Sequence, residues 1–171
     1  MIKSNPNQPA TASYDFTGKV VLVTGSASGI GKSTVAKFHG FGAQVVITDI
    51  NHEEGNKTAA ALGERAIFLP CDIRNPEQVS DLLNKTVELF GHLDIMINNA
   101  GINATAKTDR VTIDQYPGDT WQKMIDVDLT GTFYCCKAAA KVRGVGQKLT
   151  TSSRKAPDTT APSQVAQRGI G

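Results

Sequence analysis

The chain has 171 residues, of which 40% are hydrophobic and 20% charged, so it can form one globular domain but is too short for two of ordinary size. A formal net charge of +2 argues against the concentrated positive surface that binding to a nucleic-acid backbone requires. Three cysteines without CxxC spacing and three histidines without metal-ligand spacing argue against a disulfide framework and a metal site.

Residues 1–18 are expected to form a flexible arm ahead of the domain, because they are polar, contain two prolines and show no periodicity. This segment lacks an apolar signal region, and no later run approaches the length of a membrane span. We therefore expect a cytoplasmic protein that uses neither a membrane nor nucleic acid as a partner.

The run "KVVLVT" (19–24) is continuously apolar and β-branched, which predicts a strand buried on both faces. A glycine-rich turn follows, and from Gly29 the apolar positions recur at helical spacing. The pattern then repeats, with a strand at "AQVVITD" (43–49) and a helix that Asn51 caps and Gly63 ends.

A third strand, "RAIFLP" (65–70), precedes a helix that Asn75 and Pro76 open and Gly91 ends. The fourth strand is "LDIMIN" (93–98), and a polar loop, 101–118, is long enough to cover a site. A long helix is predicted from near Asp119 to Gly144, and its inward-facing stripe is expected to contain Trp121, Ile125, Leu129 and Cys136.

Buried strands that alternate with helices predict an α/β fold with a doubly wound parallel sheet. In such folds the site lies beyond the carboxyl ends of the strands. The strand–turn–helix "VVLVTGSASGIGKSTVAKF" (20–38) should therefore hold phosphate, and two interpretations compete. It matches TGxxxGIG of dinucleotide loops, and it is one residue away from the GxxxxGKS/T loop of nucleoside triphosphate binders.

Three glycines fit the dinucleotide interpretation. Gly25 lets the strand turn sharply, Gly29 lets the backbone approach a pyrophosphate, and Gly31 lets the helix pack on the sheet. The triphosphate interpretation is weaker, because Ser26 stands where its first glycine should be.

Asp49 follows Gly25 by 24 positions and ends the second strand. A carboxylate there can accept hydrogen bonds from both ribose hydroxyls and would repel a 2′-phosphate, so the sequence predicts NAD rather than NADP. The same acid could hold magnesium in the triphosphate interpretation, so it does not decide between the two.

These residues resemble the short-chain dehydrogenase/reductase family, in which TGxxxGIG, an acid ending the second strand, an Asp after the third and NNAG (98–101) recur in this order. The resemblance covers about residues 17–141. It implies three groups of NAD contacts: Gly25, Ser28, Gly29, Ile30 and Gly31 at the pyrophosphate, Asp49, Ile50, Asp72 and Ile73 at the adenosine, and Asn99, Ala100 and Gly101 at the nicotinamide-side ribose.

Asp72 and Asn99 also have simpler interpretations, which the sequence leaves open. Asp72 can cap the turn before Asn75, and Asn99 can bond loop backbone groups through Asx-type hydrogen bonds.

The resemblance also implies a catalytic centre in which a Tyr moves the proton, a Lys in a Tyr-x-x-x-Lys pair lowers the pKa of that Tyr, and a Ser orients the substrate. "GQKLTTSS" (146–153) resembles the family's fifth strand and makes Ser153 that serine. The stretch where the Tyr and Lys are expected, "TAPSQVAQRGIG", contains neither.

The motif "VDLTGTF" (127–133) places Asp128 where the family has its catalytic Asn. The spacing of Asp128 from Trp121 and Ile125 predicts that it faces the core, where an unpaired charge is costly. It is either a structural Asp with its hydrogen bonds satisfied or the acceptor for a proton-relay water.

Together these observations predict a Rossmann-like sheet of order 3-2-1-4-5, incomplete on its C-terminal side. The expected dinucleotide-binding domain spans 19–153 and an irregular tail spans 154–171, because apolar periodicity is lost after Val142 as in a truncated or degenerate ending. The predicted function is NAD-dependent hydride transfer to or from an alcohol or ketone, without appreciable turnover; the alternatives are a non-catalytic NAD-binding module and a triphosphate binder. An exposed edge strand would favour a homo-oligomer.

Overall fold

The computed structural model describes residues 14–103 and 111–142. Its four strands are β1 (Val20–Thr24), β2 (Gln44–Thr48), β3 (Ala66–Phe68) and β4 (Ile95–Ile97). The α-helices are α1 (Gly29–Gly40), α2 (His52–Leu62), α3 (Pro76–Phe90), α4 (Gly118–Met124) and α5 (Thr132–Val142). A 3₁₀ turn, η2 (Ile113–Gln115), precedes α4, and a π-helical segment, η3 (Ile125–Gly131), joins α4 to α5.

The sheet is parallel throughout and has the order β3-β2-β1-β4, which agrees with the predicted order of the first four strands. Leu22 on the central strand β1 pairs with Val46 of β2 and Met96 of β4. The predicted fifth strand (146–153) and the tail (154–171) lie outside the described residues.

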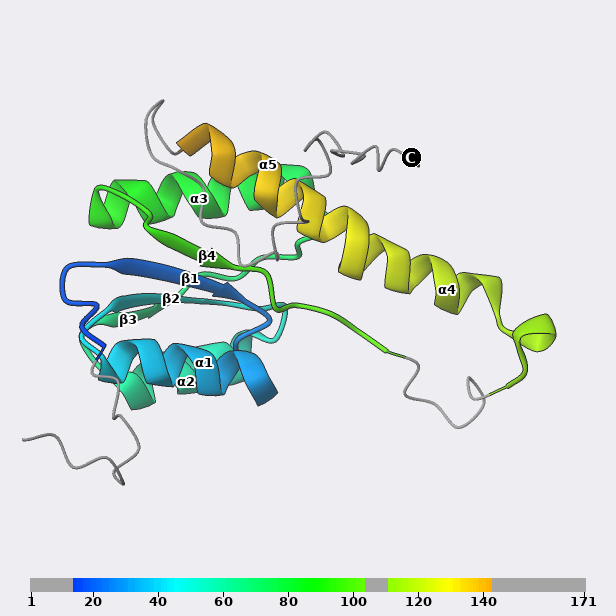
Figure 1. The fold of residues 1–171 in the computed structure, drawn as a ribbon, viewed down its shortest axis with the longest axis horizontal. Coiled ribbons are helices and arrows are strands. Elements are labelled where there is room, and N and C mark those ends of the chain that lie inside the picture. Colours follow the sequence, from blue (N-terminus) through cyan, green and yellow to red (C-terminus); the bar gives the residue numbers. More distant parts are fainter. Residues whose placement is uncertain (1–13, 104–110, 143–171) are drawn as a thin grey trace, which may run out of the picture.

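The sheet is covered on both faces, by α1 and α2 on one side and by α3 and α5 on the other (Figure 1). Alternate residues of β1 enter different cores: Val20 and Leu22 pack toward the α3–α5 side, whereas Val21 and Val23 pack toward the α1–α2 side. All of β1 is buried, which explains why its sequence is an unbroken apolar run rather than an alternating one.

The predicted helix boundaries of α2 and α3 are present. Asn51 accepts a hydrogen bond from the Glu54 N–H at 3.1 Å, and Asn75 accepts from the N–H groups of the first turn of α3. Gly91 ends α3 in the left-handed conformation, with φ of 81°, which a glycine adopts without strain.

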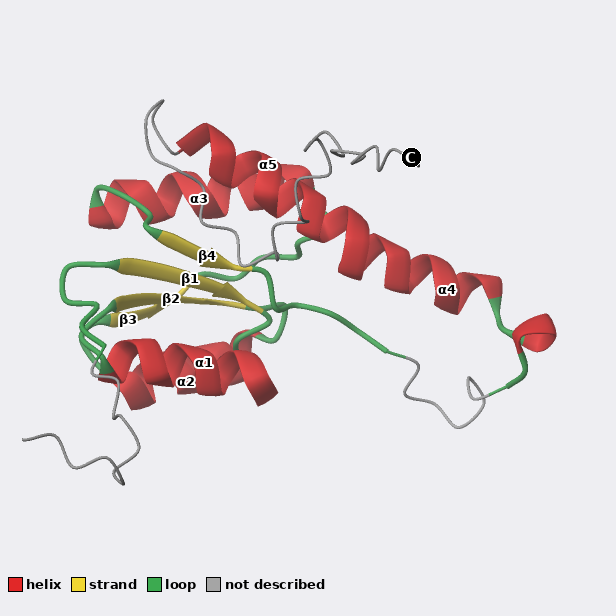
Figure 2. Cartoon of the chain, viewed as in Figure 1, coloured by secondary structure: helices red, strands yellow, loops and turns green. Residues whose placement is uncertain are grey.

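The predicted inward stripe of the long helix is wrong. Trp121 is 56% exposed and Leu129 is 64% exposed, and Cys136 is exposed as well, whereas Cys135 is the buried cysteine of α5. The π-helical segment η3 adds a residue to its turn and shifts the helical phase, so a stripe counted at α-helical spacing does not continue through it. In addition, α4 extends beyond the sheet and away from α3 (Figure 2).

The last residues of the expected N-terminal arm pack against α1. Phe16 donates its backbone N–H to the Phe41 carbonyl at 2.8 Å, and its ring lies edge-on to Phe38 with centroids 4.8 Å apart. Within the described ranges, no helix combines the length and the apolar content needed to cross a bilayer.

Candidate functional site

A groove of about 550 Å³ lies beyond the carboxyl ends of the strands, where the turn after β1 meets the segments after β2, β3 and β4. It is lined by Gly25, Ser28, Gly29, Ile30, Asp49, Ile50, Cys71, Asp72, Ile73, Arg74, Asn99, Ala100, Gly101, Ile102 and Val127. Every residue that the sequence assigned to the cofactor is in this set except Gly31. The groove is therefore formed by the segments that follow four strands, which are far apart in the chain.

Two glycines at the turn after β1 have no room for a side chain. Gly25 has φ of +63°, and a Cβ there would lie 2.7 Å from the Ala100 Cα. A Cβ on Gly31 would lie 2.6 Å from Asn99 Nδ2 and would also press on the Gly25 carbonyl oxygen. Gly31 is buried beneath the turn, where its missing side chain lets α1 approach the sheet, so its backbone supports the groove without lining it.

The amino terminus of α1 differs from those of α2 and α3. Asn51 and Asn75 cap α2 and α3, and both helices carry acidic residues in their first turn. Ser28 makes no capping hydrogen bond, and the first turn of α1 contains no acid. The first N–H groups of a helix have no partner within it, so the groove receives the partial positive charge of an uncapped helix end. This arrangement favours an anion such as phosphate.

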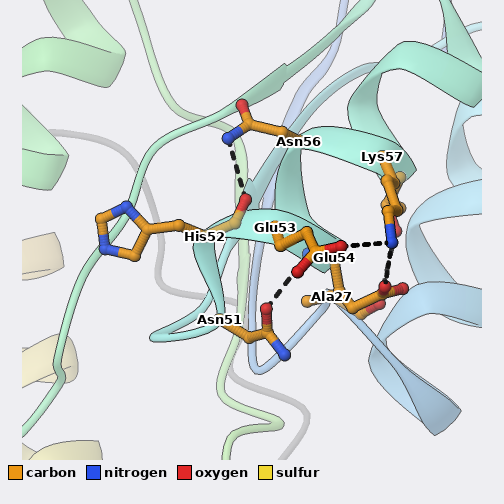
Figure 3. A network of polar contacts seen from close by, with 8 residues as sticks. Ala27, Asn51, His52, Glu53, Glu54, Asn56 and Lys57 are labelled. Atoms are coloured by element: carbon orange, nitrogen blue, oxygen red, sulfur yellow. Dashed lines mark hydrogen bonds and ion pairs between the residues drawn. The ribbon is translucent and has the colours of Figure 1, made fainter.

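The Asp49 carboxylate faces this turn. Its Oδ2 accepts a hydrogen bond from the Ala27 N–H at 3.1 Å, and its Oδ1 accepts from the Asn51 N–H at 3.0 Å. Figure 3 shows Ala27 beside the first turn of α2, whose N-cap is Asn51. Asp49 is thereby fixed at the edge of the groove, beside the turn after β1.

Two polar residues that the sequence analysis left unassigned hold the strand ends together. The Thr24 hydroxyl accepts hydrogen bonds from the N–H groups of Asn99 and Ala100, both at 3.0 Å. The buried Ser26 hydroxyl donates to the Val23 carbonyl at 2.6 Å and accepts from the Thr48 N–H at 3.0 Å. The sequence signal for Thr24 was a hydroxyl residue at the end of an otherwise apolar strand.

The position of Ser26 bears on the triphosphate interpretation of this loop. It occupies the position where that loop needs its first glycine, and its side chain joins β1 to β2 inside the protein. A buried and bonded side chain at this position does not fit the triphosphate interpretation.

The Asn99 side chain bonds backbone groups at the end of β1 and not those of its own loop. Its amide donates to the carbonyl oxygens of Thr24 at 2.9 Å and Gly25 at 3.1 Å. These bonds fix the end of β1 against the segment after β4, where Asn99 lines the groove.

Asp72 is paired with Arg74, a groove residue that the sequence analysis missed. The Arg74 Nε lies 2.9 Å and 3.0 Å from the two carboxylate oxygens, and Nη2 also donates to Oδ2. These hydrogen bonds from the Arg74 side chain lower the pKa of Asp72 below its ordinary value. Gln78, three residues into α3, accepts from the Asp72 N–H at 2.9 Å and fixes the same segment. The only sequence signal was an Arg two positions after the Asp.

Asp128 is exposed rather than core-facing, so that prediction was wrong for the same reason as the helix stripe. Its Oδ1 accepts a hydrogen bond from the Ile102 N–H at 2.9 Å, which ties η3 to the segment after β4. It borders a second cavity, of about 650 Å³, that shares Gly101 and Ile102 with the groove. Ser153, the other predicted catalytic residue, lies outside the described residues.

The buried cysteines are not suited to nucleophilic chemistry. Burial raises the pKa of Cys71 to about 11 and that of Cys135 to about 12, so both thiols stay protonated near neutral pH. All three cysteines are free, and the described part of the chain contains no group of His, Cys, Asp and Glu side chains arranged to hold a metal ion.

A parallel sheet with an uncapped helix after its first strand, a glycine turn and an acid after the second strand is the arrangement of the nucleotide-binding α/β folds. The family model of the short chain dehydrogenases matches residues 19–164. The chain therefore belongs to the short-chain dehydrogenase/reductase family, a family of oxidoreductases.

Relatives with known names agree with this membership. The chain is 38% identical over 142 residues to (+)-borneol dehydrogenase 1 of Salvia officinalis, covering 83% of this chain and 54% of the relative. It is 40% identical over 126 residues to secoisolariciresinol dehydrogenase of Forsythia intermedia, covering 73% and 44%. The chain thus spans about half the length of these relatives.

A solved structure shares the fold. A short-chain dehydrogenase/reductase from Brucella melitensis, described as a glucose/ribitol dehydrogenase, superposes with a TM-score of 0.66 at 27% sequence identity. The superposition covers 77% of this chain and 52% of that protein.

Proposed function

We propose that the groove binds NAD and that the protein transfers a hydride between this cofactor and an alcohol or ketone. The observation that carries the proposal is the meeting of an uncapped helix end, a glycine turn and a fixed carboxylate at one edge of the sheet. The helix end and the turn suit the pyrophosphate of a dinucleotide, and the carboxylate suits its adenosine ribose.

The residues of the groove fit the cofactor as follows. The turn from Gly25 to Gly29 and the amino end of α1 would hold the pyrophosphate, because backbone N–H groups can approach it there. Asp49 would accept hydrogen bonds from the adenosine ribose, and its negative charge would disfavour the extra phosphate of NADP. Gly101 borders both cavities, so the nicotinamide end would lie where the groove meets the second cavity.

The second cavity is our candidate for the alcohol or ketone. When NAD is bound it supplies the hydride acceptor, and the hydroxyl proton of the alcohol needs a separate acceptor. Within the 171 residues none of the three tyrosines, Tyr14, Tyr116 and Tyr134, begins a Tyr-x-x-x-Lys pair. We therefore propose that this chain binds the cofactor and that its hydride transfer is impaired, so that turnover of an alcohol is slow.

The absence of that pair also favours a second candidate, a non-catalytic NAD-binding module. The two candidates share the groove and differ only in chemistry. Asp128 can hold a proton-relay water in the first and is a structural tie between η3 and Ile102 in the second.

A fluorescence titration with NADH, repeated with NADPH, tests the shared part of the proposal. We expect saturable binding of NADH and weaker binding of NADPH; no binding of either cofactor would contradict it. Incubation with NAD and a panel of secondary alcohols then separates the candidates, because NADH absorbance that grows with time supports the enzyme and its absence supports the module.

A further inference from the structure

The Asp128 carboxylate lies where the groove meets the second cavity. Its Oδ1 accepts a hydrogen bond from the Ile102 N–H at 2.9 Å, and a Cβ on Gly101 would lie 3.3 Å from the same oxygen. Gly101 and Ile102 line both the groove and the second cavity, and Asp128 lines the second cavity. The carboxylate is therefore beside the place where the nicotinamide end of NAD would lie in the function proposed above.

Asp128 has no cationic partner in the described part of the chain. The Ile102 N–H is the one donor to Oδ1 there, Oδ2 receives no hydrogen bond from the described residues, and none of their Lys, Arg and His side chains lies at ion-pair distance. Lys123 lines the same cavity from α4 but forms no ion pair with this carboxylate. A carboxylate without such a partner attracts a cation that enters the cavity beside it.

The hydrogen bond to Ile102 does not itself require an acid. An asparagine at position 128 would offer an amide oxygen to the same N–H group, so η3 would stay tied to the segment after β4. What the acid adds is a charge at the wall of the cavity. The two forms of the cofactor differ in the same property, because the nicotinamide ring of NAD is positively charged and becomes uncharged when it accepts a hydride.

We propose that Asp128 shifts the preference of the site toward the oxidised cofactor, because its carboxylate attracts the charged nicotinamide ring of NAD and not the uncharged ring of NADH. This inference rests on the proposed binding of NAD, and it applies to both candidate functions. In an enzyme, Asp128 favours the complex that oxidises an alcohol. In a non-catalytic module, it makes occupancy of the groove follow the oxidised form of the cofactor.

The experiment titrates the full chain with NAD, NADH and ADP-ribose by calorimetry. Asp128→Asn keeps the acceptor for Ile102 and removes the charge, so it should raise the Kd for NAD roughly three- to tenfold and leave the Kd for NADH unchanged. The Kd for ADP-ribose, which has no nicotinamide, should also stay unchanged. Because salt screens the interaction of exposed charges, the difference between wild type and variant should shrink at high ionic strength.

Asp126→Asn is the matched control. Asp126 is the other acid of η3, accepts a hydrogen bond from Gln122 Nε2 at 2.8 Å and lines neither the groove nor the second cavity. Its substitution should leave the ratio of the two Kd values, NAD to NADH, as in the wild type. Asp128→Ala removes both the charge and the hydrogen bond to Ile102, so it should change this ratio as Asp128→Asn does and also lower the melting temperature.

Two outcomes would overturn the inference, and they are distinguishable. If the wild type binds the three probes and Asp128→Asn changes the Kd values for NAD and NADH by the same factor, or changes neither, then Asp128 is only a structural tie and the proposed function stands. If the wild type binds none of the probes, the proposed function fails and the role of Asp128 fails with it. Thermal melts of every variant separate loss of fold from loss of binding.

Discussion

At both ends of β1 a carboxylate accepts a hydrogen bond from a backbone N–H, but the two carboxylates have different neighbours. At the amino end, Asp94 accepts from the Val20 N–H at 2.9 Å and lies 3.0 Å from both Lys19 Nζ and His92 Nε2. Beyond the carboxyl end, Asp49 accepts from the Ala27 N–H and, within the described ranges, has no cationic side chain at ion-pair distance.

The difference separates a carboxylate that stabilises the fold from one that is available to a ligand. The charge of Asp94 is balanced by Lys19. Burial acts to raise the pKa of Asp94, but hydrogen bonds from the Val20 N–H and Lys19 hold that pKa below its ordinary value. Asp49 lies at the wall of the groove. We expect substitutions at the amino end to change stability and those at the carboxyl end to change binding as well.

The largest expected effect is at Gly31, beneath the glycine turn. A Cβ there would lie 2.8 Å from the Ser26 Cα and press on the Gly25 carbonyl, so Gly31→Ala should lower the free energy of unfolding by roughly 1–3 kcal/mol and abolish NADH binding. Gly40→Ala in the same helix is the control, because nothing lies within 4 Å of its new Cβ. Equal stability of the two variants in urea would show that the turn is not tightly packed.

The next effect is at Thr24, where the carboxyl end of β1 meets the segment after β4. Thr24→Val leaves the N–H groups of Asn99 and Ala100 without their acceptor, which should cost about 1–3 kcal/mol and weaken NADH binding. Thr86→Val is the matched control, because that equally buried hydroxyl donates only to a carbonyl of its own helix, Leu82. If both variants lose the same stability and neither loses affinity, Thr24 has no special role at the groove.

Asp94→Asn tests the amino end and should lower stability by about 1–2 kcal/mol at neutral pH, with NADH affinity unchanged. A carboxyl whose pKa is depressed in the folded state contributes stability above its unfolded pKa, ordinarily 3.8, and loses it as the pH falls through the folded value. Urea unfolding of both proteins at several acidic pH values should therefore give a difference that shrinks as the pH falls below about 4. A difference that grows on acidification would contradict this role.

The smallest effect is expected on α2, away from both ends of β1. Lys57 forms exposed ion pairs with Glu53 at 2.7 Å and Glu54 at 2.9 Å (Figure 3). Solvent screens such pairs, so Lys57→Ala should change the urea midpoint less than any variant above and leave NADH binding unchanged. A loss of stability as large as that of Asp94→Asn would show that exposed and half-buried ion pairs contribute equally to the stability of this protein.

The sequence predicted the fold where local patterns and burial agree. The unbroken apolar run of β1, the caps Asn51 and Asn75 and the terminating glycines each have a signal within a few residues. The order of the first four strands followed from the alternation of strands and helices together with the family resemblance.

The prediction failed where contacts depend on tertiary structure. The π-helical turn that exposes Asp128 and Leu129 has no signal at helical spacing, because the extra residue in the turn is a property of the packed helix. The pairing of Asp72 with Arg74 was missed because the resemblance assigned Asp72 to the ligand and gave no role to its neighbour. Thr24 and Ser26 were missed because they bond backbone groups far away in the sequence, in the segment after β4 and on β2.

The most direct test of NAD binding through Asp49 is one NADH titration of three proteins: wild type, Asp49→Asn and Asp94→Asn. We expect saturable binding by the wild type, a Kd raised about tenfold or more in Asp49→Asn, and an unchanged Kd in the less stable Asp94→Asn. A wild type that does not bind NADH, or an Asp49→Asn variant that binds it as tightly as the wild type, would contradict the proposed role of Asp49.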